Sequence, residues 1–293
     1  MRPKFLKTGD KIALVSPSGK TDKEFIDRGM DVVRSWGLEA IAMPRVYGGF
    51  RQFSGSDWER IEDMQKAIND RDFKAIICVR GGYGCSRIVD RLDFSPLLDY
   101  PKWLVGFSDI TVFHAQFHLM RIESIHGAMV KSYPSGAEEV KNALFGNLSE
   151  YVLPSHELNR KGEGFGVVVG GNLTMINNML GTSSEISTVG KILFIEDVHE
   201  QLYHLDRLMV QLRRAKKLEN LTGLIVGRFA DMKDCETPFG ESVEEIVTNA
   251  VSGYKYPVCF DFPSGHIEDN RAIYFGRKSR LKVDSTQSSL TFL

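Results

Sequence analysis

The chain has 293 residues, of which 42% are hydrophobic and 26% charged, a balance typical of a globular protein with about two domains. Its 37 Lys+Arg nearly cancel its 38 Asp+Glu, so we expect no nucleic-acid partner. No run approaches the ~18 apolar residues of a membrane span, and no secretory signal is recognised, so we expect no membrane partner. The four cysteines, Cys78, Cys85, Cys235 and Cys259, form no C-x-x-C pair. We therefore expect a reduced, cytoplasmic protein.

Strand and helix signals alternate in the first half of the chain. Ser56 and Glu59 match a capping box, the signature of a helix start. Strands separated by helices of roughly 10–15 residues indicate βαβ units and a mostly parallel sheet. The predicted strands are 11–16, 38–43, 74–80 and 103–107. The predicted helices are 25–36, one behind the capping box with Trp58, Ile61, Met64 and Ile68 on one face, and one after Ser108 with Ile110, Phe113, Phe117 and Met120.

The pattern changes in the second half. A polar stretch without clear period, residues 147–164, is interpreted as a linker between an N-terminal domain (1–146) and a C-terminal domain (165–293). The predicted class is α/β, with a parallel-sheet domain followed by a smaller β-rich one. Strands are predicted at 165–169, 191–195, 223–227 and 257–260, helices from Asn172 and over 201–217, and short β segments over 272–293.

Ser108 lies where an apolar strand turns into a helix. A serine at such a turn is exposed above the sheet, and the amides that open the helix can stabilise an oxyanion. The segment Gly106-Phe-Ser108-Asp-Ile lacks the second glycine of G-x-S-x-G. The local sequence therefore leaves two roles open: a nucleophile, or the commoner helix N-cap.

The loop Arg80-Gly-Gly-Tyr-Gly84 follows another strand of the same predicted sheet. Its glycines would let backbone amides approach a ligand, so the loop could supply an oxyanion donor, hold a phosphate, or serve only as a permissive turn. Cys85 is a rival nucleophile, although a small apolar filler is its commoner role. His114 and His118 have the i, i+4 spacing of metal ligands, but no third ligand is evident, so we expect no metal and a packed pair.

Glu196 and His266 also fall where predicted strands end. A hydroxyl becomes a good nucleophile when an imidazole accepts its proton, and the imidazole needs a carboxylate that fixes its tautomer. Ser108, His266 and Glu196 provide one group of each kind. Taken singly, the carboxylate and the histidine have a commoner role as ordinary surface residues.

An ordered set of motifs resembles the LD-carboxypeptidase family of serine peptidases, which includes muramoyltetrapeptide carboxypeptidases and microcin C self-immunity peptidases. The motifs span nearly the whole chain. They are residues 9–19, Arg80-Gly-Gly-Tyr-Gly84, Gly106-Phe-Ser-Asp-Ile-Thr111, His126-Gly, Gly170-Gly-Asn-Leu173, Phe194-Ile-Glu-Asp-Val198, Asp206-Arg207 and Phe262-Pro-Ser-Gly-His266.

The resemblance implies an amidotransferase-like N-terminal domain that carries the nucleophile and a C-terminal domain that carries glutamate and histidine. It assigns Ser108 as nucleophile, His266 as general base and Glu196 as orienting carboxylate, with Glu200 as a nearby rival. It also implies an oxyanion hole from the Asp109 and Gly82 amides, no cofactor and no metal, and a homodimer. An exopeptidase must hold the terminal carboxylate of its substrate, and either Arg80 or a helix N-terminus could do so. The predicted substrate contacts are Arg80, Gly81 and Asn172.

The expected reaction is cleavage of an L–D peptide bond, with release of D-Ala from a murein tetrapeptide during cell-wall recycling. A small peptide is the expected partner. One alternative is an immunity peptidase that cleaves a peptide–nucleotide conjugate, which would need aromatic residues to stack on a base. The others are a two-domain binding module without chemistry and a thiol amidase that uses Cys85.

Overall fold

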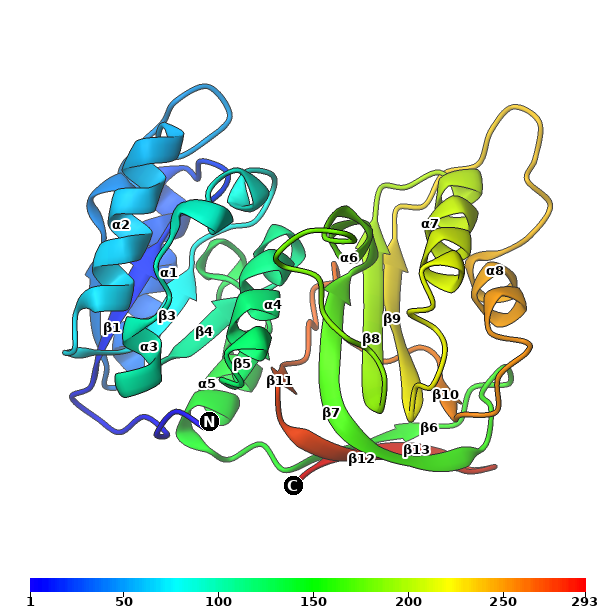
Figure 1. Ribbon diagram of the computed structural model, residues 1–293. Helices are drawn as coiled ribbons and strands as arrows, with labels where there is room; N and C mark the ends of the chain where they lie inside the picture. Colours follow the sequence, from blue (N-terminus) through cyan, green and yellow to red (C-terminus); the bar gives the residue numbers. More distant parts are fainter. The chain divides into compact units, whose positions relative to one another are not determined.

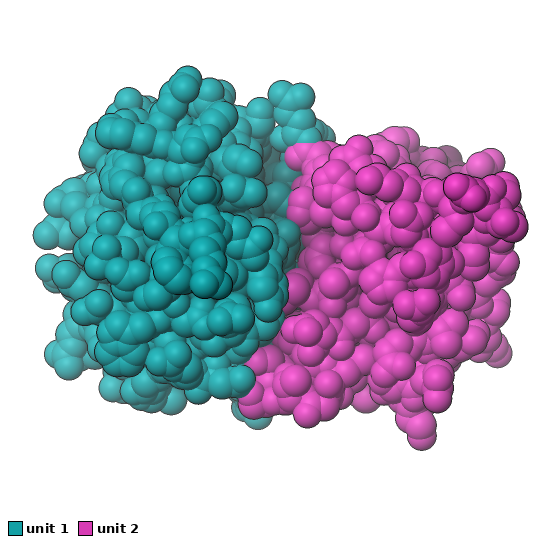
Figure 2. Space-filling view, turned by 90° about the horizontal axis from the view of Figure 1, so that it is seen from above, with its two compact units in different colours: residues 1–148, 268–276 teal, residues 149–267, 277–293 magenta.

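The computed structural model describes residues 1–293, which form two compact units (Figure 2). Unit 1 is Met1–Leu148 with Glu268–Gly276, and unit 2 is Ser149–Ile267 with Arg277–Leu293. The chain thus returns once to unit 1 near its end, in a part that we had expected to lie in the C-terminal domain. No helix is long and apolar enough to cross a bilayer.

Unit 1 is built on one sheet of six strands with the order β11-β5-β4-β3-β1-β2. Its strands are β1 (Lys11–Val15), β2 (Glu39–Ala42), β3 (Phe73–Cys78), β4 (Trp103–Gly106), β5 (Ser124–His126) and β11 (Ile273–Phe275). Its α-helices are α1 (Lys23–Ser35), α2 (Asp57–Asn69), α3 (Pro96–Asp99), α4 (Thr111–Leu119) and α5 (Ala137–Phe145). Its 3₁₀ turns are η1 (Pro44–Tyr47), η2 (Cys85–Arg87), η3 (Val89–Arg91), η4 (Ser108–Ile110) and η5 (Val130–Ser132).

Strands β1 to β5 are parallel to one another, as the alternating sequence pattern predicted. Strand β11 pairs antiparallel with β5. The carboxyl ends of β3 and β4 are neighbours, since Ala75 pairs with Trp103 and Ile77 with Val105. The glycine loop that follows β3 and the serine turn that follows β4 therefore leave the same edge of the sheet. This edge is where ligands bind in open parallel sheets.

Helix α2 shows how far local signals determine the fold. The Ser56 hydroxyl accepts a hydrogen bond from the Glu59 amide, and the Glu59 carboxylate accepts one from the Ser56 amide, so the predicted capping box is present. Ile61, Met64 and Ile68 are buried as expected, but the assignment of Trp58 to the same face is wrong, because its side chain is 65% exposed. Trp58 lies in the first turn, where the guanidinium of Arg91 lies over its ring.

Unit 2 contains a mixed sheet of seven strands with the order β10-β9-β8-β7-β12-β13-β6 (Figure 1). Its strands are β6 (Glu150–Pro154), β7 (Gly162–Asn172), β8 (Lys191–Val198), β9 (Gly223–Ala230), β10 (Val258–Cys259), β12 (Lys278–Val283) and β13 (Gln287–Phe292). Its helices are α6 (Leu173–Asn178), α7 (Leu202–Arg214) and α8 (Val243–Ala250). The segment 147–164 contains β6 and the first residues of β7.

Strand β7 joins two kinds of pairing within unit 2. Its first half, residues 162–167, pairs antiparallel with β12, and its second half pairs parallel with β8. Parallel pairing continues from β8 through β9 to β10, so β7, β8 and β9 end at one edge. Glu196 lies near the end of β8, at this edge. The mixed α/β class predicted from the sequence is confirmed in both units.

Candidate active site

Ser108 occupies a strained turn between β4 and η4. Its φ is +64°, a left-handed conformation that costs a non-glycine residue about 1–2 kcal/mol. The side chain is partly exposed, whereas Gly106 before it and Asp109 after it are buried. A serine held in a strained strand-to-helix turn is the arrangement of a nucleophile elbow, although the second glycine of the usual motif is missing.

The alternative reading of Ser108 as a helix N-cap is not supported by the structure. The N-cap of η4 is Phe107 and that of α4 is Ile110, and neither turn is capped by a side-chain hydrogen bond. Ser108 is the first residue of η4 itself. Its strained backbone therefore has no explanation in helix capping.

The glycine loop after β3 lies directly against this serine. A β-carbon placed on Gly81 would lie 3.1 Å from Ser108 Cβ and 3.3 Å from Ser108 Oγ, tighter than ordinary side-chain packing. Gly82 follows with φ +113°, which favours glycine. The predicted oxyanion donors thus lie on two loops of unit 1, and one of these loops is in contact with the serine.

Asp109 holds the surroundings of the serine in place. Its side chain is buried, and Oδ2 accepts hydrogen bonds from the Ser18 hydroxyl (2.6 Å) and the Cys85 amide (2.9 Å). Burial raises the pKa of this carboxyl, while the bonds from Ser18 and Cys85 oppose that rise. The side chain of Asp109 is therefore structural, and its backbone amide is the group predicted to face substrate.

His114 supports the same turn from within the core. Its Nε2 lies 2.8 Å from the Gly106 carbonyl oxygen, and Nδ1 lies 2.8 Å from Ser124 Oγ. Because a carbonyl can only accept, Nε2 carries the hydrogen and Nδ1 accepts from the serine. Burial lowers the pKa of His114 to about 4, so the ring is neutral at pH 7. The expectation of a packed structural histidine is confirmed here.

Cys85 is unsuited to nucleophilic chemistry. It is fully buried, and burial together with the charge of Asp109 raises the pKa of its thiol well above the ordinary value. A thiol nucleophile needs a depressed pKa and access to solvent. The structure therefore supports the filler role for Cys85.

Arg80 begins the glycine loop and is partly exposed. Its Nη1 donates a hydrogen bond of 2.6 Å to the Lys20 carbonyl, which holds the guanidinium beside the loop after β1. The salt bridges formed by arginines do not include Arg80. Its charge is therefore available to a carboxylate, as expected for a residue that holds the terminus of a peptide.

Unit 2 carries the other two candidate catalytic residues, Glu196 and His266, which form a close pair. Nδ1 of His266 lies 2.7 Å from Oε2 of Glu196. The Glu196 side chain is fully buried and that of His266 is 20% exposed. A carboxylate can only accept, so Nδ1 donates and the basic lone pair is on Nε2. This is the tautomer that a general base for a serine requires.

The environment of His266 shifts its proton affinity upward. Burial alone would lower its pKa, but the hydrogen bond from the imidazole to Glu196 and the charges of Glu196 and Asp197 outweigh burial. The net effect is a pKa above the ordinary value of 6.5. The carboxylate therefore both orients the ring and stabilises its protonated form.

Gly265 brings the histidine loop onto β8, and sequence reasoning did not single it out. Its φ is +128°, and a β-carbon there would lie 3.0 Å from both Cβ and Oε2 of Glu196. The Arg228 amide donates to the Ser264 carbonyl (2.9 Å), which attaches the loop to β9. The glycine before His266 was the available signal, since close approach to a backbone requires this residue.

The rival carboxylates next to Glu196 are engaged elsewhere. Glu200 is paired with His204 and accepts a hydrogen bond from Thr174 Oγ1 (3.1 Å). Asp197 accepts from the Thr174 amide and hydroxyl (both 2.9 Å) and from Asn172 Nδ2 (2.7 Å). The geometry within unit 2 therefore favours Glu196 as the partner of His266.

Asn172 is the N-cap of α6, as the sequence predicted for the start of this helix. Its Oδ1 accepts a hydrogen bond from the Met175 amide (3.1 Å), and its side chain is buried. Together with its bond to Asp197, this gives Asn172 a structural role at the end of β7. A contact with substrate stays a prediction.

Arg60, on α2, also escaped the sequence analysis. Its side chain is 1% exposed, and Nη1 donates to the carbonyl oxygens of Pro17 and Gly84 (3.0 Å for the latter). Its charge is balanced by Asp57. An arginine on an amphipathic helix reads as a surface residue, so only the structure reveals that it joins two loops near Ser108.

Comparison with known proteins identifies relatives along the whole chain. Residues 12–127 match the family description "LD-carboxypeptidase N-terminal domain", and residues 165–281 match "LD-carboxypeptidase C-terminal domain". A relative from Synechocystis sp., named as a candidate carboxypeptidase, is 34% identical over 100% of this chain and 97% of its own length. The murein tetrapeptide carboxypeptidase of Pseudomonas aeruginosa is 29% identical over 93% of each chain.

Solved structures agree with these matches. The crystal structure of muramoyltetrapeptide carboxypeptidase from Oxalobacter formigenes has a TM-score of 0.85 and 27% identity, covering 96% of this chain and 98% of that one. The microcin C7 self-immunity protein, in complex with aspartyl sulfamoyl adenosine, has a TM-score of 0.87. It is 20% identical over 99% of this chain and 98% of its own, which shows a common fold.

Proposed function

The chain belongs to the LD-carboxypeptidase family, and we propose that it hydrolyses the L–D peptide bond of a murein tetrapeptide and releases the terminal D-alanine. The nearly full-length similarity to a murein tetrapeptide carboxypeptidase supports this substrate class. The reaction would serve the recycling of cell-wall peptides. The proposed chemistry needs Ser108 of unit 1 to act together with the Glu196–His266 pair of unit 2.

In the proposed mechanism, Ser108 Oγ attacks the carbonyl carbon of the scissile bond while His266 Nε2 takes the hydroxyl proton. The carbonyl oxygen becomes an oxyanion, which collapses as the C–N bond breaks and His266 passes the proton to the leaving amine of D-alanine. Water then attacks the acyl-enzyme by the same proton route, which regenerates Ser108 and frees the tripeptide acid. Glu196 stabilises the imidazolium in both steps.

The amides of Asp109 and Gly82 would bind the oxyanion. Two facts support this choice: the Gly81 backbone packs against Ser108, and Asp109 follows Ser108 directly as the second residue of η4. Hydrogen-bond donors that are already in place stabilise the oxyanion more than mobile donors do, because no reorganisation is needed as the charge develops. Arg80 would hold the terminal carboxylate of the peptide, and Gly81 would lie along it.

The observation that carries the proposal is the buried Glu196–His266 pair with its tautomer set for a base. The direct test is mass spectrometry of the protein after mixing with murein tetrapeptide. An acyl adduct on Ser108, together with released D-alanine, is expected. Ser108→Ala should give neither product, while still folding and binding the peptide. Release of D-alanine at the wild-type rate by Ser108→Ala would refute the mechanism.

For the alternative substrate, a peptide–nucleotide conjugate, the segment 147–164 supplies no exposed aromatic ring. Its recognition needs an exposed aromatic ring on which a base can stack. Tyr151, an aromatic residue in the segment 147–164 between the two predicted domains, is buried against Phe262 and Phe292. Turnover of murein tetrapeptide should therefore exceed that of an aminoacyl sulfamoyl adenylate by a wide margin in parallel assays of the purified enzyme.

Cytoplasmic location and a homodimer complete the proposal. All four cysteines are unpaired thiols, and three of them are buried, which suits a reducing compartment. Recycled wall peptides would reach the enzyme there. Fractionation of cells and light scattering of the purified protein test these two statements separately.

A further inference from the structure

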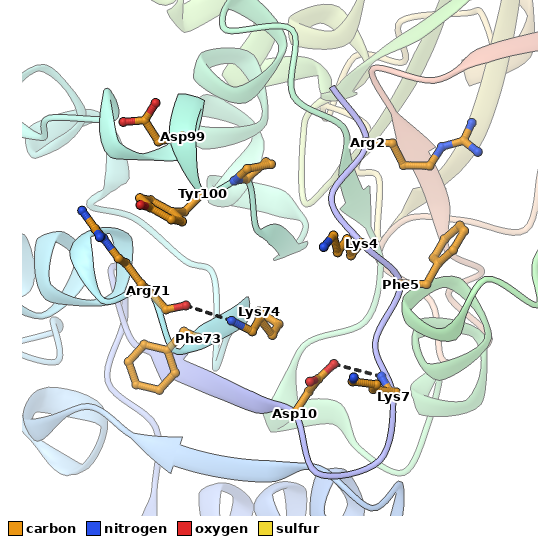
Figure 3. A pocket seen from close by; sticks show the side chains of 11 residues that line it. Arg2, Lys4, Phe5, Lys7, Asp10, Arg71, Phe73, Lys74, Asp99 and Tyr100 are labelled. Carbon is orange, nitrogen blue, oxygen red and sulfur yellow. Dashed lines mark hydrogen bonds between the residues drawn. The ribbon is translucent and has the colours of Figure 1, made fainter.

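A pocket of about 590 Å³ lies within unit 1, away from the carboxyl ends of β3 and β4, which precede the glycine loop and Ser108 (Figure 3). Its walls come from the segment before β1, from Phe73 and Lys74 at the start of β3, and from Tyr100 and Pro101 just before β4. The pocket therefore occupies the amino ends of these strands. Its volume falls in the range of ~300–1,000 Å³ that small-molecule sites show.

The side chains around this pocket are mainly cationic, although the whole chain has a formal net charge of −1. Five basic residues line it against two acidic ones. Lys4, Lys7, Arg71 and Lys74 form no ion pair, and of their charged groups only Lys74 Nζ donates a hydrogen bond within the protein, to the Arg71 carbonyl (2.9 Å). Four cations in one concave surface repel each other and concentrate anions.

These cations are not needed to stabilise the adjoining helix end. The carboxyl end of α2 carries partial negative charge, which nearby cations could offset. Buried Lys102 already does so, because its Nζ donates to the carbonyl oxygens of Ala67 and Ile68 (both 2.8 Å) and of Asp70. The exposed cations of the pocket are therefore not required to offset the negative end of α2.

The pocket also has an aromatic wall beside its cations. The guanidinium of Arg71 lies 4.3 Å from the centre of the Tyr100 ring, which orients it. The Tyr100 side chain is 39% exposed, and Phe73 closes the wall as a buried residue. Figure 3 shows Tyr100, Lys4 and Lys74 around the same space. Such a surface suits an anion that is joined to an apolar or flat group.

We propose that this pocket binds an organic diphosphate. One phosphate group carries about two negative charges, so the four unpaired cations match two linked phosphates better than one. Guanidinium and ammonium groups are the usual partners of phosphate oxygens, and the Tyr100 wall would contact the organic part. Within unit 1 the pocket shares no lining residue with the Ser108 turn or the glycine loop, and the proposal does not depend on the peptidase activity.

Isothermal titration calorimetry of the full chain with ADP, pyrophosphate and adenosine tests this proposal. ADP should bind, pyrophosphate should bind more weakly because it lacks the organic group, and adenosine should not bind. Binding should weaken as salt concentration rises, since exposed charges are screened. The variant Lys7→Gln/Arg71→Gln should lose roughly tenfold or more in ADP affinity.

The matched control is Lys66→Gln/Arg91→Gln. These residues are also an exposed lysine and an exposed arginine, the latter over the Trp58 ring at 5.8 Å, and they lie outside the pocket. ADP affinity should be unchanged in this control. The proposal is overturned if neither ADP nor pyrophosphate binds at millimolar concentration, if the pocket variant binds as well as the control, or if murein tetrapeptide displaces ADP from Ser108→Ala protein.

Discussion

Arg60 and Asp109 hold the same two loops through consecutive residues. Arg60 donates hydrogen bonds to one carbonyl in each loop, and Asp109 accepts one from the next residue of each loop. The partners are Pro17 and Gly84 for Arg60, and Ser18 and Cys85 for Asp109. Both side chains are buried, so the loops after β1 and β3 are fixed beside the serine turn by bonds that water does not weaken.

Replacement of Asp109 should separate this positioning role from folding. Asp109→Ala leaves two buried donors without an acceptor and should reduce the free energy of unfolding by about 3 kcal/mol. Asp109→Asn keeps an oxygen acceptor, so it should reduce the free energy of unfolding by clearly less than Asp109→Ala does. If the bonds position the oxyanion donors, both variants lower kcat more than they raise KM. Urea unfolding and steady-state kinetics measure the two effects. Unchanged kcat in folded Asp109→Asn would argue against a positioning role.

The strain at Ser108 predicts an order of stability among its variants. Glycine adopts φ +64° without the clash that alanine and serine suffer there. Ser108→Gly should therefore be more stable than Ser108→Ala by about 1 kcal/mol, although glycine is usually the less stable of the two. Both variants should lack peptidase activity. Equal stabilities in chemical denaturation would show that the turn is not strained.

The sequence allowed the elements and most of the catalytic candidates to be predicted, because these depend on local patterns. The capping box at Ser56 and the cap at Asn172 are examples in which three or four adjacent residues decide the outcome. The return of 268–276 to unit 1 was not predictable, since β11 pairs with β5 across about half of the chain. No local signal marks such a distant pairing.

Choices between neighbouring residues also needed the structure. Glu196 and Glu200 are equally acidic and four residues apart, and only the hydrogen bond to His266 separates them. Arg60 and Arg91 each follow an acidic residue and precede a hydrophobic one, yet the first is buried and the second exposed. Burial depends on what packs against a helix from elsewhere in the chain, and periodicity does not report that.

The raised pKa of His266 predicts the pH dependence of both activity and stability. The base must be neutral, so kcat/KM should rise with pH through a midpoint above 6.5. Folding raises this pKa, so the folded state binds the proton more tightly than the unfolded state. The resulting stabilisation is complete below pH 6.5 and is lost as pH rises through the folded value. Histidine NMR titration measures that value directly.

Glu196→Gln should shift this profile in a defined direction. Without the carboxylate, burial remains as the main influence, so the pKa of His266 falls and the activity midpoint moves to lower pH. The rate should drop on the order of 10³–10⁴-fold, because the imidazolium is no longer stabilised. Glu200→Gln is the control, since Glu200 pairs with His204 and should leave the midpoint in place. An identical shift in both variants would contradict the assignment of Glu196.

Cysteine chemistry should leave the enzyme active. Cys85 is buried with a raised thiol pKa, whereas Cys235 is exposed. Iodoacetamide should therefore label Cys235 in the native protein and spare Cys85, with no loss of peptidase activity. Cys85→Ser should also retain activity, because Asp109 contacts the backbone amide at this position. Loss of activity that tracks labelling of Cys85 would restore the thiol hypothesis.

Gly265 offers the sharpest test of how the histidine loop is built. A methyl group there meets Cβ and Oε2 of Glu196 at 3.0 Å, and alanine also disfavours φ +128°. Gly190 has a positive φ of +70° with open space around it. Gly190→Ala therefore introduces backbone strain alone and should reduce the free energy of unfolding by about 1 kcal/mol. Gly265→Ala should cost roughly 3 kcal/mol and, by moving His266 off Glu196, should lower kcat and the pKa of the imidazole together. If the two alanine variants lose the same stability and keep the same pH profile, the close approach of Gly265 to Glu196 does not position the base.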